Sequence, residues 1–301
     1  MASVLEVADG VYQIEPEDLE RGIICLGYLV VDDQIALIET GSTSQVPEIL
    51  AGMAKLGCDA NSLSYVIPTH VHVDHGGGAG YLAQQTPQAQ VVLHQRGARH
   101  LIDPTKLIEG TRQAFGKNFE KLFGPVLPVP ESQVLAVEGG ESILMGEREL
   151  MIIDAPGHAP HHICVYDTKS AGVFCGEALG CYIPADDSLI LASAPPIFEL
   201  DLALDTIGKL RDLAPEILFF SQWGVGRDAL RLIDLAEEYT RTCGDIILEA
   251  MKAREPEDII MQKVQPYMRD SKYVKSEFLQ RTLRTFVIGP YVAYFRREGL
   301  A

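Results

Sequence analysis

The segment THVHVDHGGG at residues 69–78 constrains the fold more than any other stretch of the sequence. It contains three histidines and an aspartate within six positions, after a short apolar run and before three glycines. Burying an imidazole without a partner is unfavourable, so this crowding needs a physical reason. Residues two apart face the same side of an extended chain, so His70 and His72 can bind one metal ion. Asp74 and His75 then reach a neighbouring ion, and the segment predicts a metal site at the end of a buried strand.

A second group of histidines lies in the segment APGHAPHH at residues 155–162. His158 follows an apolar strand and a Pro-Gly turn, and His162 is expected to hold a metal ligand in place from behind. Six of the eight histidines therefore fall in two short loops, each at the end of a predicted strand. The isolated His94 and His100 are expected to be surface or packing residues. Imidazole nitrogen with carboxylate oxygen suits zinc, iron or manganese, so we expect one or two divalent ions.

The spacing of apolar residues divides most of the chain into two similar halves. Alternating apolar positions before residue 40 predict antiparallel strands, and helical spacing begins at residue 46. A second strand-rich portion follows residue 128, and helical spacing returns at residues 198–213. This order predicts an α/β fold in which two sheets pack together with helices on the outside.

Two further segments are predicted to be helical. Residues 97–124 are rich in charged and polar side chains around scattered apolar ones, which predicts a helical insertion that can serve as a lid. Residues 229–301 have helical periodicity. We therefore divide the chain into a main domain at 1–228 and a C-terminal helical extension at 229–301. The extension is expected to pack against the main domain or to form a homodimer.

Composition limits the partners and the compartment. The 301 residues carry a formal charge of -17, which opposes binding to nucleic acid and to anionic membrane surfaces. The N-terminal residues lack the pattern of a signal peptide, and no apolar run approaches the ~20 residues of a membrane span. The six cysteines form no CxxC pair, so we expect reduced thiols in a cytoplasmic protein.

The two histidine loops together resemble those of the metallo-β-lactamase-fold hydrolases. This superfamily includes thioesterases of the glyoxalase II kind, lactonases, phosphodiesterases and the diiron flavodiiron proteins. The resemblance covers about residues 3–235 and implies an αββα sandwich with a dinuclear site at one edge of the two sheets. It further implies that His70, His72 and His158 bind metal one and that Asp74 and His75 bind metal two.

Three positions differ from the pattern of the family. Glu39 in IETG stands where an aspartate generally has a supporting role, and Glu177 in FCGEALG stands where a bridging aspartate is expected. Gln222 in FFSQWG stands where a final histidine is expected. Glu177 keeps the charge but adds a methylene, and Gln222 offers a neutral amide oxygen in place of an imidazole. We therefore expect metal one to bind firmly and metal two to bind weakly, to exchange, or to be completed by water.

The resemblance implies a hydrolase in which a metal-bound hydroxide attacks an ester-like small molecule, such as a thioester, a lactone or a phosphodiester. Asp74 is expected to orient the hydroxide, and Tyr182 to donate a proton. A diiron protein that binds or reduces oxygen is one alternative, although that branch usually carries an acidic residue at the position of His72 and a fused flavodoxin domain. A metal-binding sensor with little turnover is another. The acidic charge disfavours a nuclease.

Overall fold

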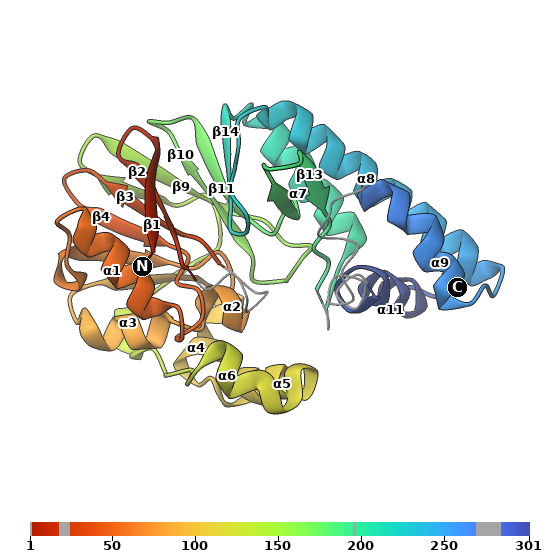
Figure 1. Cartoon of the computed structure of the whole chain (residues 1–301), viewed down its shortest axis with the longest axis horizontal. Helices are drawn as coiled ribbons and strands as arrows, with labels where there is room; N and C mark the ends of the chain where they lie inside the picture. The colour runs from red at the N-terminus through yellow and green to blue at the C-terminus, as the bar shows by residue number, and fades with distance from the viewer. Residues whose placement is uncertain (1, 18–24, 195–196, 269–283) are drawn as a thin grey trace.

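A computed structural model describes residues 2–17, 25–194, 197–268 and 284–301, and its centre is a pair of stacked sheets (Figure 1). The first sheet has seven strands in the order β1-β2-β3-β4-β5-β6-β7. Its first four strands are antiparallel, and β4 to β7 run parallel to one another. The strands are β1 (Ser3–Ala8), β2 (Val11–Glu15), β3 (Gly27–Val31), β4 (Ile35–Ile38), β5 (Leu63–Ile67), β6 (Gln90–His94) and β7 (Val134–Val137).

The second sheet has six strands in the order β15-β14-β11-β10-β9-β8. Within it β11 and β14 are parallel, and the other neighbours are antiparallel. A separate two-stranded hairpin is formed by β12 and β13. The strands are β8 (Ser142–Met145), β9 (Arg148–Asp154), β10 (Ile163–Asp167), β11 (Gly172–Gly176), β12 (Cys181–Ile183), β13 (Ser188–Ile190), β14 (Ile217–Phe220) and β15 (Val225–Gly226).

Both faces of the central strands are buried, which explains their nearly continuous apolar sequence. In β3, Tyr28 and Val30 face the second sheet and pack with Phe174 and Phe219. The intervening Leu29 faces the opposite way, into the core beneath the outer helices. The period of two along the strand therefore assigns alternate residues to two different cores.

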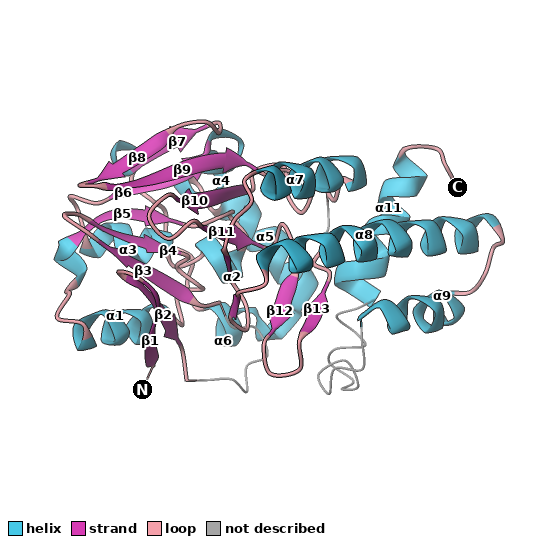
Figure 2. Cartoon of the chain, turned by 90° about the horizontal axis from the view of Figure 1, so that it is seen from above, coloured by secondary structure: helices cyan, strands magenta, loops and turns pink. Residues whose placement is uncertain are grey.

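Helices cover both outer faces (Figure 2). On the first sheet, apolar residues of α1 and α3 pack with those of β3 to β6. On the second sheet, apolar residues of α7, α8 and α11 pack with those of β11 and β14. The helices are α1 (Val46–Lys55), α2 (Val73–Gly76), α3 (Ala79–Gln85), α4 (Gln95–Ile102), α5 (Thr105–Phe115), α6 (Phe119–Phe123), α7 (Leu200–Asp212), α8 (Ala229–Lys252), α9 (Glu257–Val264) and α11 (Gly289–Arg297). Shorter helical turns are η2 (Ala60–Ser62), η3 (Gly116–Asn118), η4 (Glu131–Gln133), η5 (Gln265–Met268) and the π-helical η6 (Arg284–Ile288).

The αββα sandwich expected from the sequence is therefore confirmed, with a C-terminal helical part. Helices α4, α5 and α6 occupy the predicted insertion and lie along the lower edge in Figure 1. Helices α8, α9 and α11 follow the predicted start of the extension, and residues 269–283 of that segment lie outside the described residues. The lid, the domain boundary and the homodimer remain predictions. No helix among the described residues has the length and apolar character needed to cross a bilayer.

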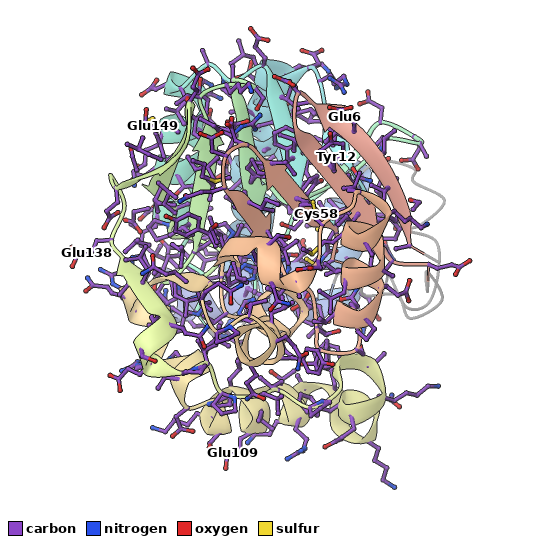
Figure 3. All side chains as sticks on the ribbon, turned by 90° about the vertical axis from the view of Figure 1, so that its left-hand side faces the viewer. Glu6, Tyr12, Cys58, Glu109, Glu138 and Glu149 are labelled. Carbon is purple, nitrogen blue, oxygen red and sulfur yellow. The ribbon has the colours of Figure 1, made fainter. Side chains whose placement is uncertain are left out.

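The surface carries many of the acidic side chains that give the chain its charge. Figure 3 labels Glu6, Glu109 and Glu138, which are exposed on three different parts of the chain. The six cysteines are all free thiols, and five of them are buried. The expectation of unpaired cysteines is thus confirmed.

Candidate metal centre

Five strands of the two sheets end beside the predicted site. Glu39 follows β4, and the HVHVDH motif follows β5, which is parallel to β4. Glu177 follows β11, and Gln222 lies two residues beyond the parallel β14. His158 lies in the loop between β9 and β10. Parallel neighbours end at the same edge, so the topology brings these residues together at one edge of the sandwich.

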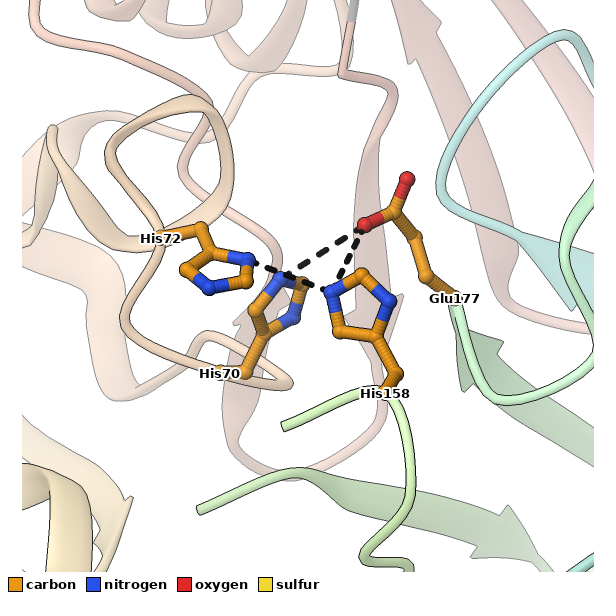
Figure 4. A group of neighbouring side chains, drawn as sticks. All are labelled: His70, His72, His158 and Glu177. Carbon is orange, nitrogen blue, oxygen red and sulfur yellow. Dashed lines mark hydrogen bonds and ion pairs between the residues drawn. The ribbon is translucent and has the colours of Figure 1, made fainter. Parts of the chain in front are cut away.

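Four side chains form the centre of the cluster: His70, His72, His158 and Glu177 (Figure 4). One donor atom of each lies within 4.8 Å of all the others. Nε2 of His158 is 3.0 Å from Oε2 of Glu177 and 3.1 Å from Nδ1 of His72. Nε2 of His70 is 3.7 Å from the same Glu177 oxygen. A tetrahedral ion with ligands at about 2.0–2.1 Å separates its donors by about 3.3 Å, so these spacings suit a metal ion.

Two of the imidazoles are held by contacts at the nitrogen that points away from the cluster. Nδ1 of His158 lies 2.6 Å from the carbonyl oxygen of Ala192, to which it donates. Nδ1 of His70 lies 3.0 Å from Oγ1 of Thr69, whose own hydroxyl donates to Glu39. These contacts leave the Nε2 lone pairs directed into the cluster.

Glu39 accepts hydrogen bonds from residues that hold the imidazoles, and its own backbone is in a strained conformation. Its φ of +64° is in the left-handed region, which is uncommon for a residue other than glycine. Its carboxylate is fully enclosed and accepts from Thr69 at 2.6 Å and from Ser221 at 2.5 Å. It also accepts from Nδ1 of His75 at 3.1 Å. Burial disfavours the charged form of Glu39, but His75 and these hydrogen bonds outweigh it and hold its pKa below the ordinary value.

Two buried nitrogen atoms of the donor set lack hydrogen-bond partners. Nε2 of His70 and Nε2 of His75 are buried and have no hydrogen-bond partner. Leaving such an atom unpaired is costly, and a metal ion would satisfy both. Burial and the neighbouring histidines keep the pKa values of His70 and His72 well below the ordinary value, so both are neutral. Neutral imidazole is the form that binds a metal, so the residues fit the expected ion.

The predicted ligands of metal two are also adjacent. Nε2 of His75 is 3.6 Å from Oδ2 of Asp74 and 3.6 Å from Oε2 of Glu177. Burial disfavours a charged His75, but Cys25, Glu39 and Asp74 raise its pKa well above the ordinary value. The surroundings of His75 therefore favour a positive charge, which a divalent ion would supply.

Gln222 lies where the sequence placed it, beside Glu177. Its Nε2 donates to Oε1 of Glu177 at 3.2 Å, so the amide is anchored to the predicted bridging carboxylate. His162 also contacts Glu177, because Nε2 of His162 accepts from the backbone N–H of Glu177 at 3.1 Å. His162 therefore lies directly behind a predicted metal ligand. The metal roles of all these residues remain predictions.

Among the described residues, Tyr182 makes its contacts away from the histidine cluster. Its hydroxyl donates to Oδ1 of Asp187 at 3.0 Å, and its ring packs near Phe220. The physical reason is that Tyr182 belongs to β12, where alternate side chains face opposite sides of the hairpin. The structure therefore gives no support to Tyr182 as a proton donor.

Two cysteines beside the site were not anticipated from the sequence. Sγ of Cys181 lies 3.6 Å from Glu177 and 3.5 Å from the side-chain oxygen of Gln222. Sγ of Cys25 lies 3.6 Å from Nδ1 of His75. Neither cysteine belongs to a CxxC pair. The short spacing between Glu177 and Cys181 is the one feature of the sequence that indicates a cysteine close to the site.

The C-terminal helices form one wall next to the cluster. A cavity of about 20 Å³, roughly the size of one water molecule, lies between His158 and Glu177 on one side and Thr240 and Tyr291 on the other. Thr240 belongs to α8 and Tyr291 to α11. The C-terminal helical part therefore contributes to the lining of the space next to the cluster.

The metallo-beta-lactamase superfamily model matches residues 21–223. Since this match covers more than half of the sequence, the chain belongs to the metallo-beta-lactamase superfamily. The matched region contains every residue of the cluster described above.

Individual relatives are more distant. A metallo-beta-lactamase fold-containing protein of Sulfurisphaera tokodaii is 25% identical over 168 residues, which cover 55% of this chain and 62% of that protein. A hydroxyacylglutathione hydrolase of Methylococcus capsulatus is 29% identical, with 47% of this chain and 46% of that protein covered. A nitric oxide reductase of Moorella thermoacetica is 24% identical, with 61% and 43% covered. The chain thus spans less than two thirds of each of these relatives.

Solved structures agree on the fold. A metallo-beta-lactamase family protein from Thermus thermophilus has a TM-score of 0.71 at 19% identity, with 98% of this chain and 95% of that chain covered. An archaeal superfamily protein from Sulfolobus tokodaii has a TM-score of 0.67 at 19% identity, with 96% and 98% covered. The likeness to both extends over the C-terminal helical part as well as the sandwich.

Proposed function

We propose that this chain is a metal-dependent hydrolase that acts on an ester-like small molecule, such as a thioester, a lactone or a phosphodiester. The main support is that Nε2 of His70 and of His75 are buried, unpaired and directed at the carboxylate of Glu177. This donor set suits zinc, iron or manganese. A bound ion of this kind lowers the pKa of water toward about 7 and polarises a carbonyl or phosphoryl oxygen.

The residues of the chain have distinct tasks in this proposal. His70, His72 and His158 hold the first ion, and Glu177 lies between the two sets of ligands. The side chain of Asp74 is 25% exposed, compared with 11% for Glu177, so Asp74 is the more accessible carboxylate for orienting water and accepting its proton. The hydroxyacylglutathione hydrolases among the relatives support hydrolysis as the reaction class.

The proposed partner is a small molecule. A formal charge of -17 opposes contact with phosphate backbones and anionic membranes. The free thiols fit a reducing compartment, so a cytoplasmic location is part of the proposal. A homodimer through the C-terminal helices also remains a proposal, which the oligomeric state in solution would test.

The function is tested by turnover of thioester, lactone and bis-phosphate-ester reporters after loading with zinc, manganese or iron. We expect at least one reporter class to be hydrolysed. His70→Ala and His158→Ala should each lose bound metal and reduce the rate by more than about 100-fold, because each removes a nitrogen donor. Metal content that is unchanged in both variants would refute the metal assignment.

Two alternatives are distinguished by the same samples. A coloured iron-loaded protein that binds or reduces oxygen and hydrolyses no reporter would favour a redox protein, as the similarity to a nitric oxide reductase allows. Tight metal binding with neither activity would favour a sensor.

A further inference from the structure

A tight turn after Glu177 places Cys181 next to the cluster of predicted metal ligands. The backbone N–H of Gly180 donates to the carbonyl of Glu177 at 3.1 Å, and Gly180 has a φ of +85°. A side chain at Gly180 would also meet the carbonyl of Ile190 at 2.3 Å, so only glycine fits this turn. The turn places Sγ of the next residue, Cys181, in the enclosed space between Glu177 and Gln222.

The carboxylate of Glu177 has different donors at its two oxygens. Its Oε2 faces the histidines, including His75 at 3.6 Å and His158 at 3.0 Å. Its Oε1 faces Nε2 of Gln222 at 3.2 Å and Sγ of Cys181 at 3.6 Å. A tetrahedral zinc ion with Zn–S of about 2.3 Å and Zn–O of about 2.0 Å separates sulfur from oxygen by about 3.5 Å. The separation between Cys181 and Glu177 therefore suits two ligands of one ion.

An independent observation indicates that an ion belongs beside the same carboxylate, at its other oxygen, Oε2. Nε2 of His75 is fully buried, has no hydrogen-bond partner, and faces one oxygen each of Asp74 and Glu177. These three residues supply three donors, and a closed tetrahedral site needs a fourth. Besides the histidines, the side chains that contact the carboxylate of Glu177 among the described residues are those of Gln222 and Cys181, both at Oε1.

Of these two, Cys181 is the stronger donor. The amide of Gln222 is neutral and already donates its N–H to Glu177. A cysteine thiolate is an anionic, soft ligand that binds zinc strongly. We propose that Cys181 supplies a thiolate ligand to the second metal ion, where position 222 carries no histidine. This assignment depends on the dinuclear metal site of the proposed function.

Binding of the metal by Cys181 exchanges one proton for the metal ion. The thiol proton of Cys181 leaves to solvent as the sulfur–metal bond forms, and no oxidation occurs. A thiolate ligand favours zinc or cobalt over manganese. The second ion should therefore discriminate against manganese more strongly than the first.

The ligand is identified by titrating the metal-free full chain with Co²⁺ and recording the near-ultraviolet spectrum. A thiolate-to-cobalt charge-transfer band should grow with the second equivalent of Co²⁺. Cys181→Ser should lose this band and bind the second equivalent at least roughly tenfold more weakly. Cys25→Ser and Cys243→Ser are matched controls that should keep the band, since Cys25 faces the opposite nitrogen of His75 and Cys243 lies in α8.

A further variant tests the relation to position 222. Adding Gln222→His to Cys181→Ser should restore the second equivalent without restoring the band, because an imidazole replaces the thiolate. Gln222→Ala alone should keep both the band and the second ion.

Several results would overturn the assignment. Two bound Co²⁺ ions without any band in the unaltered protein would exclude a thiolate ligand, whether or not the variants fold. Loss of the band in Cys25→Ser but not in Cys181→Ser would assign the thiolate to Cys25. Loss of the second ion in Gln222→Ala but not in Cys181→Ser would assign the ligand to Gln222. Failure to bind even one Co²⁺ ion would refute the proposed function and this inference together.

Discussion

Glu39 shows how one side chain can position several of the predicted metal ligands. Its carboxylate contacts Nδ1 of His75 directly and His70 through the hydroxyl of Thr69. It thereby fixes which nitrogen of each imidazole carries the proton. The sequence predicted a supporting role for Glu39, but the left-handed backbone and the contact with Ser221 were not predictable, because both depend on residues distant in the chain.

Replacement of Glu39 by glutamine should weaken metal binding without removing any ligand. The amide keeps the size of the side chain but loses the charge and one acceptor oxygen. Oε1 faces the hydroxyls of Thr69 and Ser221 and Nδ1 of His75, and Oε2 accepts from the backbone N–H of Thr69, so an NH2 group in place of either oxygen would face a donor. We expect metal affinity to fall by roughly 10–100-fold, as measured by competition with a chromophoric chelator. Glu39→Asp keeps the charge and should retain more affinity than Glu39→Gln. Equal affinity in the unaltered protein and Glu39→Gln would contradict this role.

At the scale of elements, the periodic segments were predictable and the short ones were not. Apolar spacing located α1 and α7, since each repeats its pattern over several residues, and β5 was predicted from the short apolar run before the histidine motif. The hairpin of β12 and β13 was missed because its strands have only three residues each. Cys181 lies in that hairpin, so the same limitation hid its position beside Glu177.

The metal-binding motif itself also differs from the sequence prediction at its end. His70 and His72 precede a single helical turn, α2, instead of continuing an extended segment through Asp74. Gly77 and Gly78 have φ values of -62° and -79°, so they do not form a left-handed turn. The lack of a side chain at Gly78 allows close packing. A side chain there would lie 2.5 Å from Cγ2 of Val46 in α1.

Gly78→Ala should therefore destabilise the junction between the motif and α1. The added methyl group overlaps Val46 and lies 3.0 Å from the carbonyl of Thr40, so one element must move. We expect a loss of about 1–3 kcal/mol in the free energy of unfolding, measured by urea denaturation. Gly110→Ala in α5 is the control: nothing lies within 4 Å, and alanine favours a helix, so stability should stay equal or rise. Equal stability of Gly78→Ala and the unaltered protein would show that the junction adapts freely.

At the scale of the whole molecule, two helical segments flank the edge of the sandwich that carries the site. The insertion and the C-terminal helical part approach each other where the rings of Phe115 and Phe286 stack, with centroids 6.3 Å apart. The hydroxyl of Ser193 donates to the carbonyl oxygen of Phe286, which connects this region to the loop after β13. The two helical segments were each predictable from periodicity, but their contact was not, because nothing in either pattern specifies a partner.

Removal of metal should lower the thermal stability of the whole chain. The cluster has two buried, unpaired imidazole nitrogens when no ion is bound, and the folded state alone assembles the ligands. An ion present at about 100 times its dissociation constant stabilises the folded state by about 2.7 kcal/mol. For a chain of 301 residues, that corresponds to a fall in Tm of roughly 4 °C on chelation, measured by differential scanning fluorimetry. Restoring zinc should restore the original Tm.

The variant His158→Ala separates this effect from any direct action of the chelator. It lacks one nitrogen donor of the cluster, so its Tm should change little on addition of chelator or of zinc. A fall of the same size in His158→Ala would assign the stabilisation to another site. An unchanged Tm in the unaltered protein after complete metal removal would mean that the histidine loops are held by the two sheets alone, and that the ion contributes to chemistry and not to folding.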